Sequence, residues 1–207
     1  MKLFFADTET TGLDPAKNEL FQLAFLIEID GKVVDERNIR FRPERPENIS
    51  SEALEITRKT KEELLSYPPR KKGFRELIAT LGKWVGRYDK TDKMIWIGQN
   101  PDFDIRFVRA LFSDMGDNYF GSWWDPRPAD LISLAVASKT RGVFNPPNFK
   151  LGSLAAEFGI AFEAHDALAD VQVTRRVWHR LAENIRPPAS TKKKVNPVQE
   201  ELELDLS

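Results

Sequence analysis

The sequence predicts an α/β protein with a central mixed sheet flanked by helices. Two apolar segments, residues 20–29 and 32–42, flank Asp30-Gly31, and this pattern is a strong signal for a β-hairpin. Farther along the chain, an apolar segment at residues 94–98 is followed by segments in which apolar residues recur with helical spacing. Strands that come first and then alternate with helices are typical of an α/β sheet with mixed strand directions.

Each remaining element is expected from a local pattern. Residues 2–6 form an apolar run typical of a strand. Thr60 and Glu63 have the spacing of a capping box, so a short helix is expected to begin there and to end before Pro68. Helical apolar spacing predicts longer helices over residues 74–85, 103–111, 130–137, 151–158 and 167–182.

The composition changes after Asn184. A linker with two prolines is followed by three lysines and then by a segment rich in glutamate and leucine. This part lacks the apolar content to fold alone. Residues 1–183 are therefore expected to form the single folded domain, and residues 184–207 are expected to form a disordered tail.

Composition and charge exclude several classes of protein. The chain has no cysteine, which excludes disulfides and thiolate metal sites. Its first residues lack the pattern of a signal peptide, and no apolar run approaches the ~20 residues of a membrane span, so a cytoplasmic location is expected. A net charge of -1 argues against a protein that coats nucleic acid by bulk electrostatics. It is compatible with an enzyme that holds only a few nucleotides.

The first candidate site is Asp7-Thr8-Glu9, at the end of the first predicted strand. Residues i and i+2 of a strand point to the same face, so both carboxylates are expected to converge. Two hard oxygen donors at one point favour Mg²⁺ or Mn²⁺. The alternative is a strand that simply ends in polar solvent.

Two further acidic positions lie near the starts of predicted helices. Asp104 follows Phe103 on an apolar helix, where a carboxylate costs free energy unless it is paired or binds a metal. The alternative for Asp104 is a solvated position on the helix flank. Asp170 shares the apolar stripe of the last helix, and His165 precedes that helix. A loop or capping role is the alternative for the histidine.

Three other motifs have weaker interpretations. Trp123-Trp124 could stack on bases, although packing is the commoner role of such a pair. Arg70-Lys71-Lys72 could contact phosphates or form solvated surface. His179 lies among arginines on what is expected to be the outer face of the last helix, and no role is assigned to it.

The combination of the acidic motifs resembles a known family. The segments FADTETTGLDP, GQNPDFDIRFV and LGSLAAEFGIAFEAHDALADVQVT are similar to the three motifs of the DEDDh branch of DnaQ-like exonucleases, which have a ribonuclease H-like fold. The likeness runs from about Lys2 to Leu181. It extends to the catalytic domain of bacterial exonuclease I and to polymerase proofreading subunits. The chain departs from the pattern at Gln99, where family members often have histidine.

The resemblance implies a role for each site residue. The implied metal ligands are Asp7, Glu9, Asp104 and Asp170. They would hold two Mg²⁺ or Mn²⁺ ions that clamp the attacking and leaving oxygens of an in-line displacement. His165 would be the general base that activates the attacking water. The residues implied to contact the 3′-terminal nucleotide are Thr10, Gly12, Leu13, Asn100 and Phe103.

The resemblance also implies a substrate and a context. The expected reaction is 3′→5′ removal of nucleoside 5′-monophosphates from single-stranded or frayed DNA, in DNA replication, repair or proofreading. Two alternatives stay open, an exoribonuclease that trims RNA or degrades short oligomers and a catalytically silent module associated with a polymerase. Leu204-Asp205-Leu206 is similar to the centre of bacterial sliding-clamp-binding peptides, so a clamp or polymerase is a candidate partner of the tail.

Overall fold

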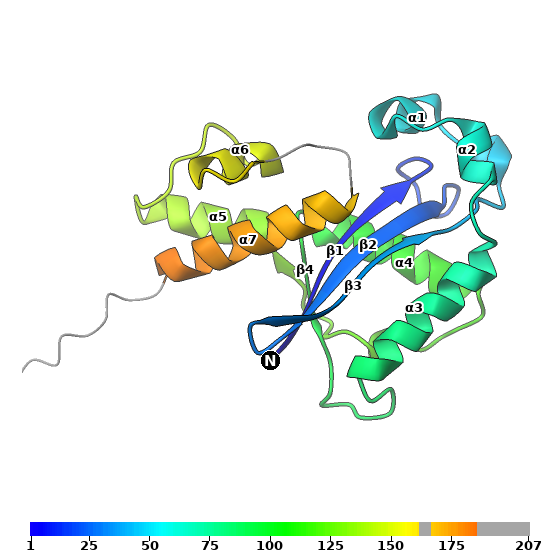
Figure 1. The fold of residues 1–207 in the computed structure, drawn as a ribbon, viewed down its shortest axis with the longest axis horizontal. Coiled ribbons are helices and arrows are strands. Elements are labelled where there is room, and N and C mark those ends of the chain that lie inside the picture. The colour runs from blue at the N-terminus through cyan, green and yellow to red at the C-terminus, as the bar shows by residue number, and fades with distance from the viewer. Residues whose placement is uncertain (162–166, 186–207) are drawn as a thin grey trace, which may run out of the picture.

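Five strands form one mixed sheet, and helices cover both of its faces (Figure 1). The computed structural model describes residues 1–161 and 167–185. The strand order is β3-β2-β1-β4-β5. The pairs β3–β2 and β2–β1 are antiparallel, whereas β1–β4 and β4–β5 are parallel. The predicted α/β class with a mixed central sheet is therefore confirmed.

The strands agree with the sequence patterns except at two places. Their bounds are Lys2–Thr10 (β1), Leu20–Ile29 (β2), Lys32–Arg40 (β3), Ile95–Gly98 (β4) and Ala129–Asp130 (β5). The hairpin turns at Asp30 and Gly31, whose φ angles of 49° and 82° are left-handed, as such a turn requires. The first strand is longer than predicted because its ladder with β2 continues past residue 6. The two-residue β5 was not predicted.

Seven α-helices are present in the described ranges. They are Ser51–Thr57 (α1), Lys61–Leu65 (α2), Arg70–Trp84 (α3), Pro101–Asp114 (α4), Leu131–Thr140 (α5), Leu151–Glu157 (α6) and Ala167–Ile185 (α7). The hydroxyl of Thr60 accepts a hydrogen bond from the Glu63 N–H at 3.1 Å, which confirms the predicted cap of α2. The short α1 was not predicted. No described helix is both long and apolar enough to cross a bilayer.

The alternation of side chains along β1 divides the core into two layers. Phe4 and Ala6 pack toward α3 and α4, whereas Leu3 and Phe5 pack toward α7 on the opposite face. Both Trp123 and Trp124 are buried in the first layer. Packing is therefore the role of this tryptophan pair, and base stacking is excluded by burial.

The inner side of α7 is more polar than the sequence suggested. His179 Nε2 lies 2.9 Å from a carboxylate oxygen of Glu28, and Arg175 reaches the same carboxylate. Glu28 is a buried residue of β2. The prediction that His179 lies on the outer face of the helix was wrong, because an acidic residue of the sheet pairs with it.

A buried ion-pair network joins α3 to the start of β2 and the end of α4. Arg70 is 1% exposed, and its guanidinium lies 3.2 Å from Glu19 and 2.9 Å from Asp114. Glu19 in turn accepts hydrogen bonds from the backbone N–H groups of residues 44 and 45. Arg70 therefore contacts neither phosphate nor solvent, and the sequence had suggested one or the other.

Removing this arginine should destabilise the domain strongly. Arg70→Met keeps the side-chain volume but leaves the buried Glu19 without its main partner, and such losses cost about 3–5 kcal/mol. Urea unfolding measures the difference. Arg75→Ala, which removes an exposed arginine from the same helix, should change the free energy of unfolding by less than about 0.5 kcal/mol. Equal effects of the two substitutions would contradict the role assigned to Arg70.

Candidate active site

The acidic residues of β1 lie where the central strand loses a neighbour. Asp7 and Glu9 continue the face of β1 that carries Phe5. The parallel ladder with β4 ends at the pair Phe5 and Ile97, because the chain then leaves the sheet and enters α4. One edge of β1 is therefore unpaired beside both carboxylates. Functional groups commonly gather where strands of an α/β sheet end in this way.

Asp104 occupies this free edge from the first turn of α4. The helix begins after Asn100, whose left-handed φ of 56° turns the chain, and Pro101 starts the first turn. One carboxylate oxygen of Asp104 accepts hydrogen bonds from the Thr8 N–H at 3.0 Å and from the Thr8 hydroxyl at 2.6 Å. Asp104 is only 4% exposed. These donors compensate part of the cost of burying a carboxylate.

The carboxylates of the site repel one another. Burial and repulsion from Asp104, Glu9 and Asp170 hold the pKa of Asp7 well above its ordinary value. Burial also raises the pKa of Asp104 to about 7, although the hydrogen bonds from Thr8 oppose the rise. The three other predicted acidic residues are thus within electrostatic reach of Asp7.

The start of α7 brings the fourth carboxylate to the site. Ala167 and Val171 pack against Phe5, which seats the first turn of the helix beside β1. Asp170 lies in that turn. The predicted base, His165, lies outside the described residues.

The acidic set has the chemistry of a divalent-cation site. Four carboxylates offer hard oxygen donors, and a bound cation would relieve the repulsion that raises their pKa values. In the described part of the chain, no three histidine, aspartate or glutamate side chains are grouped closely enough to hold one ion together. The donor types thus suit a hard divalent cation, although the described side chains do not form a set of three ligands around one point.

A cleft of about 520 Å³ opens beside Glu9. Four of the five residues predicted to contact the terminal nucleotide line it, namely Thr10, Gly12, Leu13 and Phe103. The fifth, Asn100, is not part of its lining, and its N–H donates to Asp130 instead. The structure thus brings most of the predicted contact residues to one cavity next to the acidic cluster.

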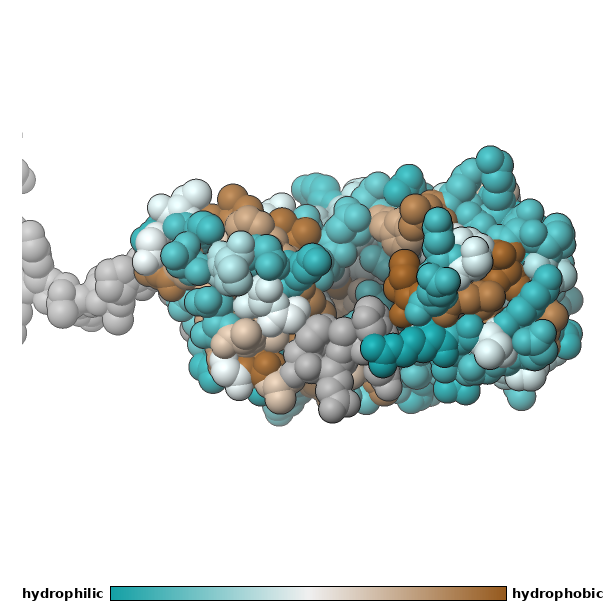
Figure 2. Space-filling view, turned by 90° about the horizontal axis from the view of Figure 1, so that it is seen from above, coloured by the Kyte–Doolittle hydropathy of each residue, from teal (hydrophilic) through white to brown (hydrophobic). Residues whose placement is uncertain are grey.

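The opposite wall of the cleft comes from α1, which the sequence did not reveal. Ala53, Ile56 and Thr57 line it. Ile56 is 62% exposed and Leu13 is 80% exposed, so large apolar side chains stand in solvent on both walls. Figure 2 shows patches of apolar surface on the half of the molecule that carries α1 and α2, and also on the other half. Exposed apolar groups at a cleft are typical of a binding surface.

The loop after β1 depends on a close contact between Gly12 and Asn18. A Cβ at Gly12 would lie 2.5 Å from the Asn18 side chain. That side chain donates to the carbonyl of Asn48 at 2.7 Å and accepts from the Asp14 N–H at 3.0 Å. Glycine at position 12 therefore allows the loop and the segment before α1 to share one asparagine.

Gln99 has a structural contact in this protein. Its side-chain amide donates to the carbonyl of Phe149 at 2.7 Å. The contact ties the end of β4 to the segment before α6. Glutamine, which stands at position 99 where family members often have histidine, thus makes a hydrogen bond within the domain.

Comparison with known proteins decides the class of this site. The family model described as Exonuclease (RNase_T) matches residues 4–178, which is most of the chain. The chain belongs to the exonuclease family. The matched region is an exonuclease domain of the DnaQ-like type.

The exonuclease domain resembles parts of longer proteins. It is 29% identical to the PolC-type DNA polymerase III of Thermotoga petrophila over 187 residues, which are 90% of this chain and 12% of that protein. Exonuclease I of Methylocaldum szegediense matches with a TM-score of 0.73 and 22% identity, over 90% of this chain and 41% of the other. The zinc-bound complex of E. coli exonuclease I with single-stranded DNA matches with a TM-score of 0.72 and 22% identity, over the same shares. The ribonuclease H-like fold is confirmed, and this exonuclease domain spans about an eighth of the curated polymerase relative.

The raised pKa of Asp104 predicts how the stability of the metal-free exonuclease domain depends on pH. A carboxyl group with a pKa of about 7 in the folded state and about 4 in the unfolded state binds more protons when folded. The free energy of unfolding should therefore fall as the pH rises from about 5 to about 8. Thermal unfolding in a chelating buffer measures this, and Asp104→Asn should flatten the dependence. An unchanged pH dependence in the variant would show that Asp104 is not its source.

Proposed function

We propose that the exonuclease domain removes nucleotides one at a time from the 3′ end of single-stranded or frayed DNA and releases nucleoside 5′-monophosphates. The main support is the position of the acidic cluster, whose Glu9 lines a cleft of about 520 Å³. Cavities of roughly 300–1,000 Å³ suit small ligands, and one terminal nucleotide is such a ligand. The cleft walls would hold the nucleoside while the carboxylates lie beside its phosphate.

In this proposal the acidic residues hold two divalent metal ions, which are Mg²⁺ or Mn²⁺. The ligands are Asp7, Glu9, Asp104 and Asp170. Bound ions of this kind supply stabilisation of negative charge on the attacking and leaving oxygens. The contribution of the protein is orientation, since Thr8 fixes one oxygen of Asp104 through two hydrogen bonds. The zinc-bound exonuclease I complex supports a divalent ion without indicating which one.

Nucleotide binding is assigned to the residues that line the cleft. Leu13 and Phe103 would supply apolar contact area for the base. Thr10 donates its hydroxyl to the Gly12 carbonyl at 2.7 Å, which holds the loop in place. His165 would take a proton from the attacking water, for which an ordinary histidine pKa of about 6.5 is suited.

The biological setting is proposed from the relatives. A PolC-type polymerase carries the matching region as a small share of its length, which supports a role beside a DNA polymerase in proofreading, replication or repair. A single-stranded DNA complex of exonuclease I supports DNA over RNA. A sliding clamp or polymerase bound through residues 184–207, and a cytoplasmic location, complete the proposal.

The substrate assignment predicts an order of rates. With Mg²⁺ or Mn²⁺ present, single-stranded DNA should be shortened from its 3′ end faster than blunt duplex DNA, and RNA should be shortened more slowly. Oligonucleotides labelled at the 5′ end and resolved on gels measure all three rates. Faster turnover of RNA would favour an exoribonuclease, and no turnover of any substrate would favour a silent module.

The division of labour predicts different effects of two kinds of substitution. Asp7→Asn and Asp104→Asn should weaken Mn²⁺ binding and abolish turnover together, because each removes a ligand. His165→Ala should lower the rate by about 10²–10⁴-fold, the usual contribution of a general base. Calorimetry should find that the Mn²⁺ affinity of the His165→Ala variant is nearly unchanged.

The second histidine offers a matched control. His179 pairs with Glu28 on α7 and touches none of the proposed ligands, so His179→Gln should retain turnover. Near-normal activity of His165→Ala at saturating Mg²⁺ would show that His165 is not the base. Retained activity of Asp104→Asn would overturn the whole site.

A further inference from the structure

Arg58 adopts a backbone conformation that its residue type disfavours. It ends α1 with φ 54° and ψ 36°, which is the left-handed region. The other described residues besides glycine with positive φ are Asp30 and Asn100, and aspartate and asparagine tolerate this region. A helix normally ends here with glycine or asparagine. Strained residues of this kind gather at functional sites.

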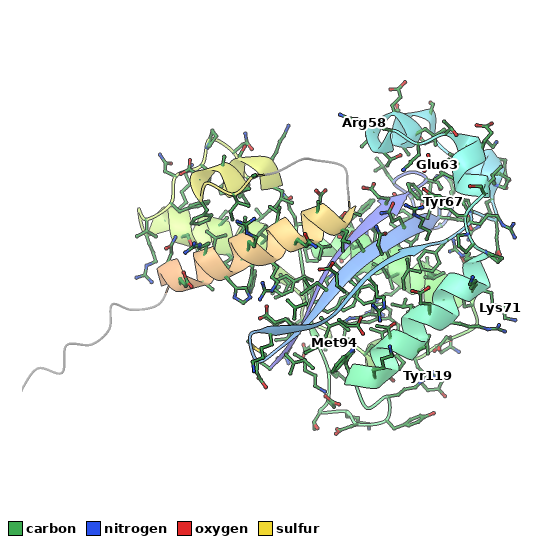
Figure 3. All side chains as sticks on the ribbon, in the orientation of Figure 1. Arg58, Glu63, Tyr67, Lys71, Met94 and Tyr119 are labelled. Carbon is green, nitrogen blue, oxygen red and sulfur yellow. The ribbon has the colours of Figure 1, made fainter. Side chains whose placement is uncertain are left out.

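Arg58 stands next in the chain to the cleft wall, although it is not itself part of the lining. It directly follows Ile56 and Thr57, which line the wall formed by α1. Its side chain is exposed, and Figure 3 shows it at the side of α1 that is turned toward α6 and α7. No acidic side chain in the described ranges forms an ion pair with it. An exposed cation thus follows the α1 wall of the cleft without an acidic partner among the described residues.

The charges of the cleft explain why a cation is needed there. The acidic residues of its lining are Glu9, Asp14 and Glu52. Lys17 is the one basic residue of the lining, and its ammonium group lies 3.6 Å from Asp14. Glu9 is assigned to the proposed metal ions and Asp14 is paired with Lys17. Glu52 therefore leaves the rest of the lining with net negative charge, which opposes the approach of a strand of phosphodiesters.

We propose that Arg58 binds a phosphodiester of the single strand whose 3′ end occupies the cleft. This inference rests on the proposed function and adds a contact on the α1 side of the entrance. The guanidinium supplies the positive charge that the lining lacks, and it suits phosphate better than a lysine would. The contact does not read the base, so it should strengthen binding of all sequences alike.

The conformation of Arg58 allows stability and binding to be separated in one variant. Arg58→Gly replaces a strained residue with the one that the left-handed region favours, so the melting temperature should rise by about 2–4 °C. The same variant loses the phosphate contact. Its KM for single-stranded oligonucleotides should rise several-fold while kcat stays unchanged. A mere structural role would move stability and activity in the same direction.

The salt dependence of KM identifies the contact as a phosphate. For single-stranded nucleic acid, each neutralised phosphate contributes about 0.7 to the slope of log affinity against log salt concentration. Arg58→Gly should reduce the slope by about that amount, and Arg58→Lys should keep most of it. Arg75→Ala removes an exposed arginine of α3 that is not part of the cleft, and its slope should equal that of the wild type.

Each outcome decides between the alternatives. Unchanged KM and salt slope in Arg58→Gly would overturn the phosphate contact, as would an equal loss in Arg75→Ala. A lower melting temperature in Arg58→Gly would overturn the strained conformation. If the wild-type chain released no nucleotides, the proposed function itself would fail. If the wild type released nucleotides and Arg58→Gly had the same KM and salt slope, only the inference about Arg58 would fail.

Discussion

Asp104 accepts two hydrogen bonds from Thr8, and this contact joins α4 to β1 where β4 has left the sheet. The hydrogen bonds and the burial of Asp104 have opposite effects on its pKa. The donors of Thr8 favour the charged carboxylate, whereas burial favours the neutral one. The result is a pKa of about 7 for Asp104. The contact also fixes where α4 begins, and thereby where Phe103 meets the cleft. The geometry of the site and its electrostatics therefore depend on one interaction across the edge of β1.

The substrate cleft is built from chain segments that are supported from behind. The Thr11 hydroxyl accepts from the Glu19 N–H at 2.8 Å, and Glu19 pairs with the buried Arg70. On the other wall, the Ser50 N–H donates to the Thr11 carbonyl, which places α1 opposite the loop that follows β1. Ion pairs in the interior thus hold the loop that exposes Leu13 at the cleft. Such support is what keeps a binding surface preorganised.

Local patterns revealed the parts of the fold that local interactions form. The hairpin at Asp30-Gly31 needs only its turn residues, and it was predicted within two residues. The short β5 escaped prediction because it exists only through pairing with β4. The acidic residues could be named because each stands where an element begins or ends, yet the contact between Thr8 and Asp104 spans 96 residues of sequence. The position of α1 likewise depends on a contact between distant parts of the chain, from Ser50 to Thr11. The role of His165 stays a prediction.

Among the described residues, the sheet ends at β3, which has no strand on its outer side. Five of its nine residues are charged: Lys32, Asp35, Glu36, Arg37 and Arg40. An open edge strand is a template for intermolecular pairing, and charged side chains along it discourage the addition of a foreign strand. The polymerase relative carries its matching region beside a much larger remainder. A charged border of this kind protects the edge strand from aggregation without covering it with further structure.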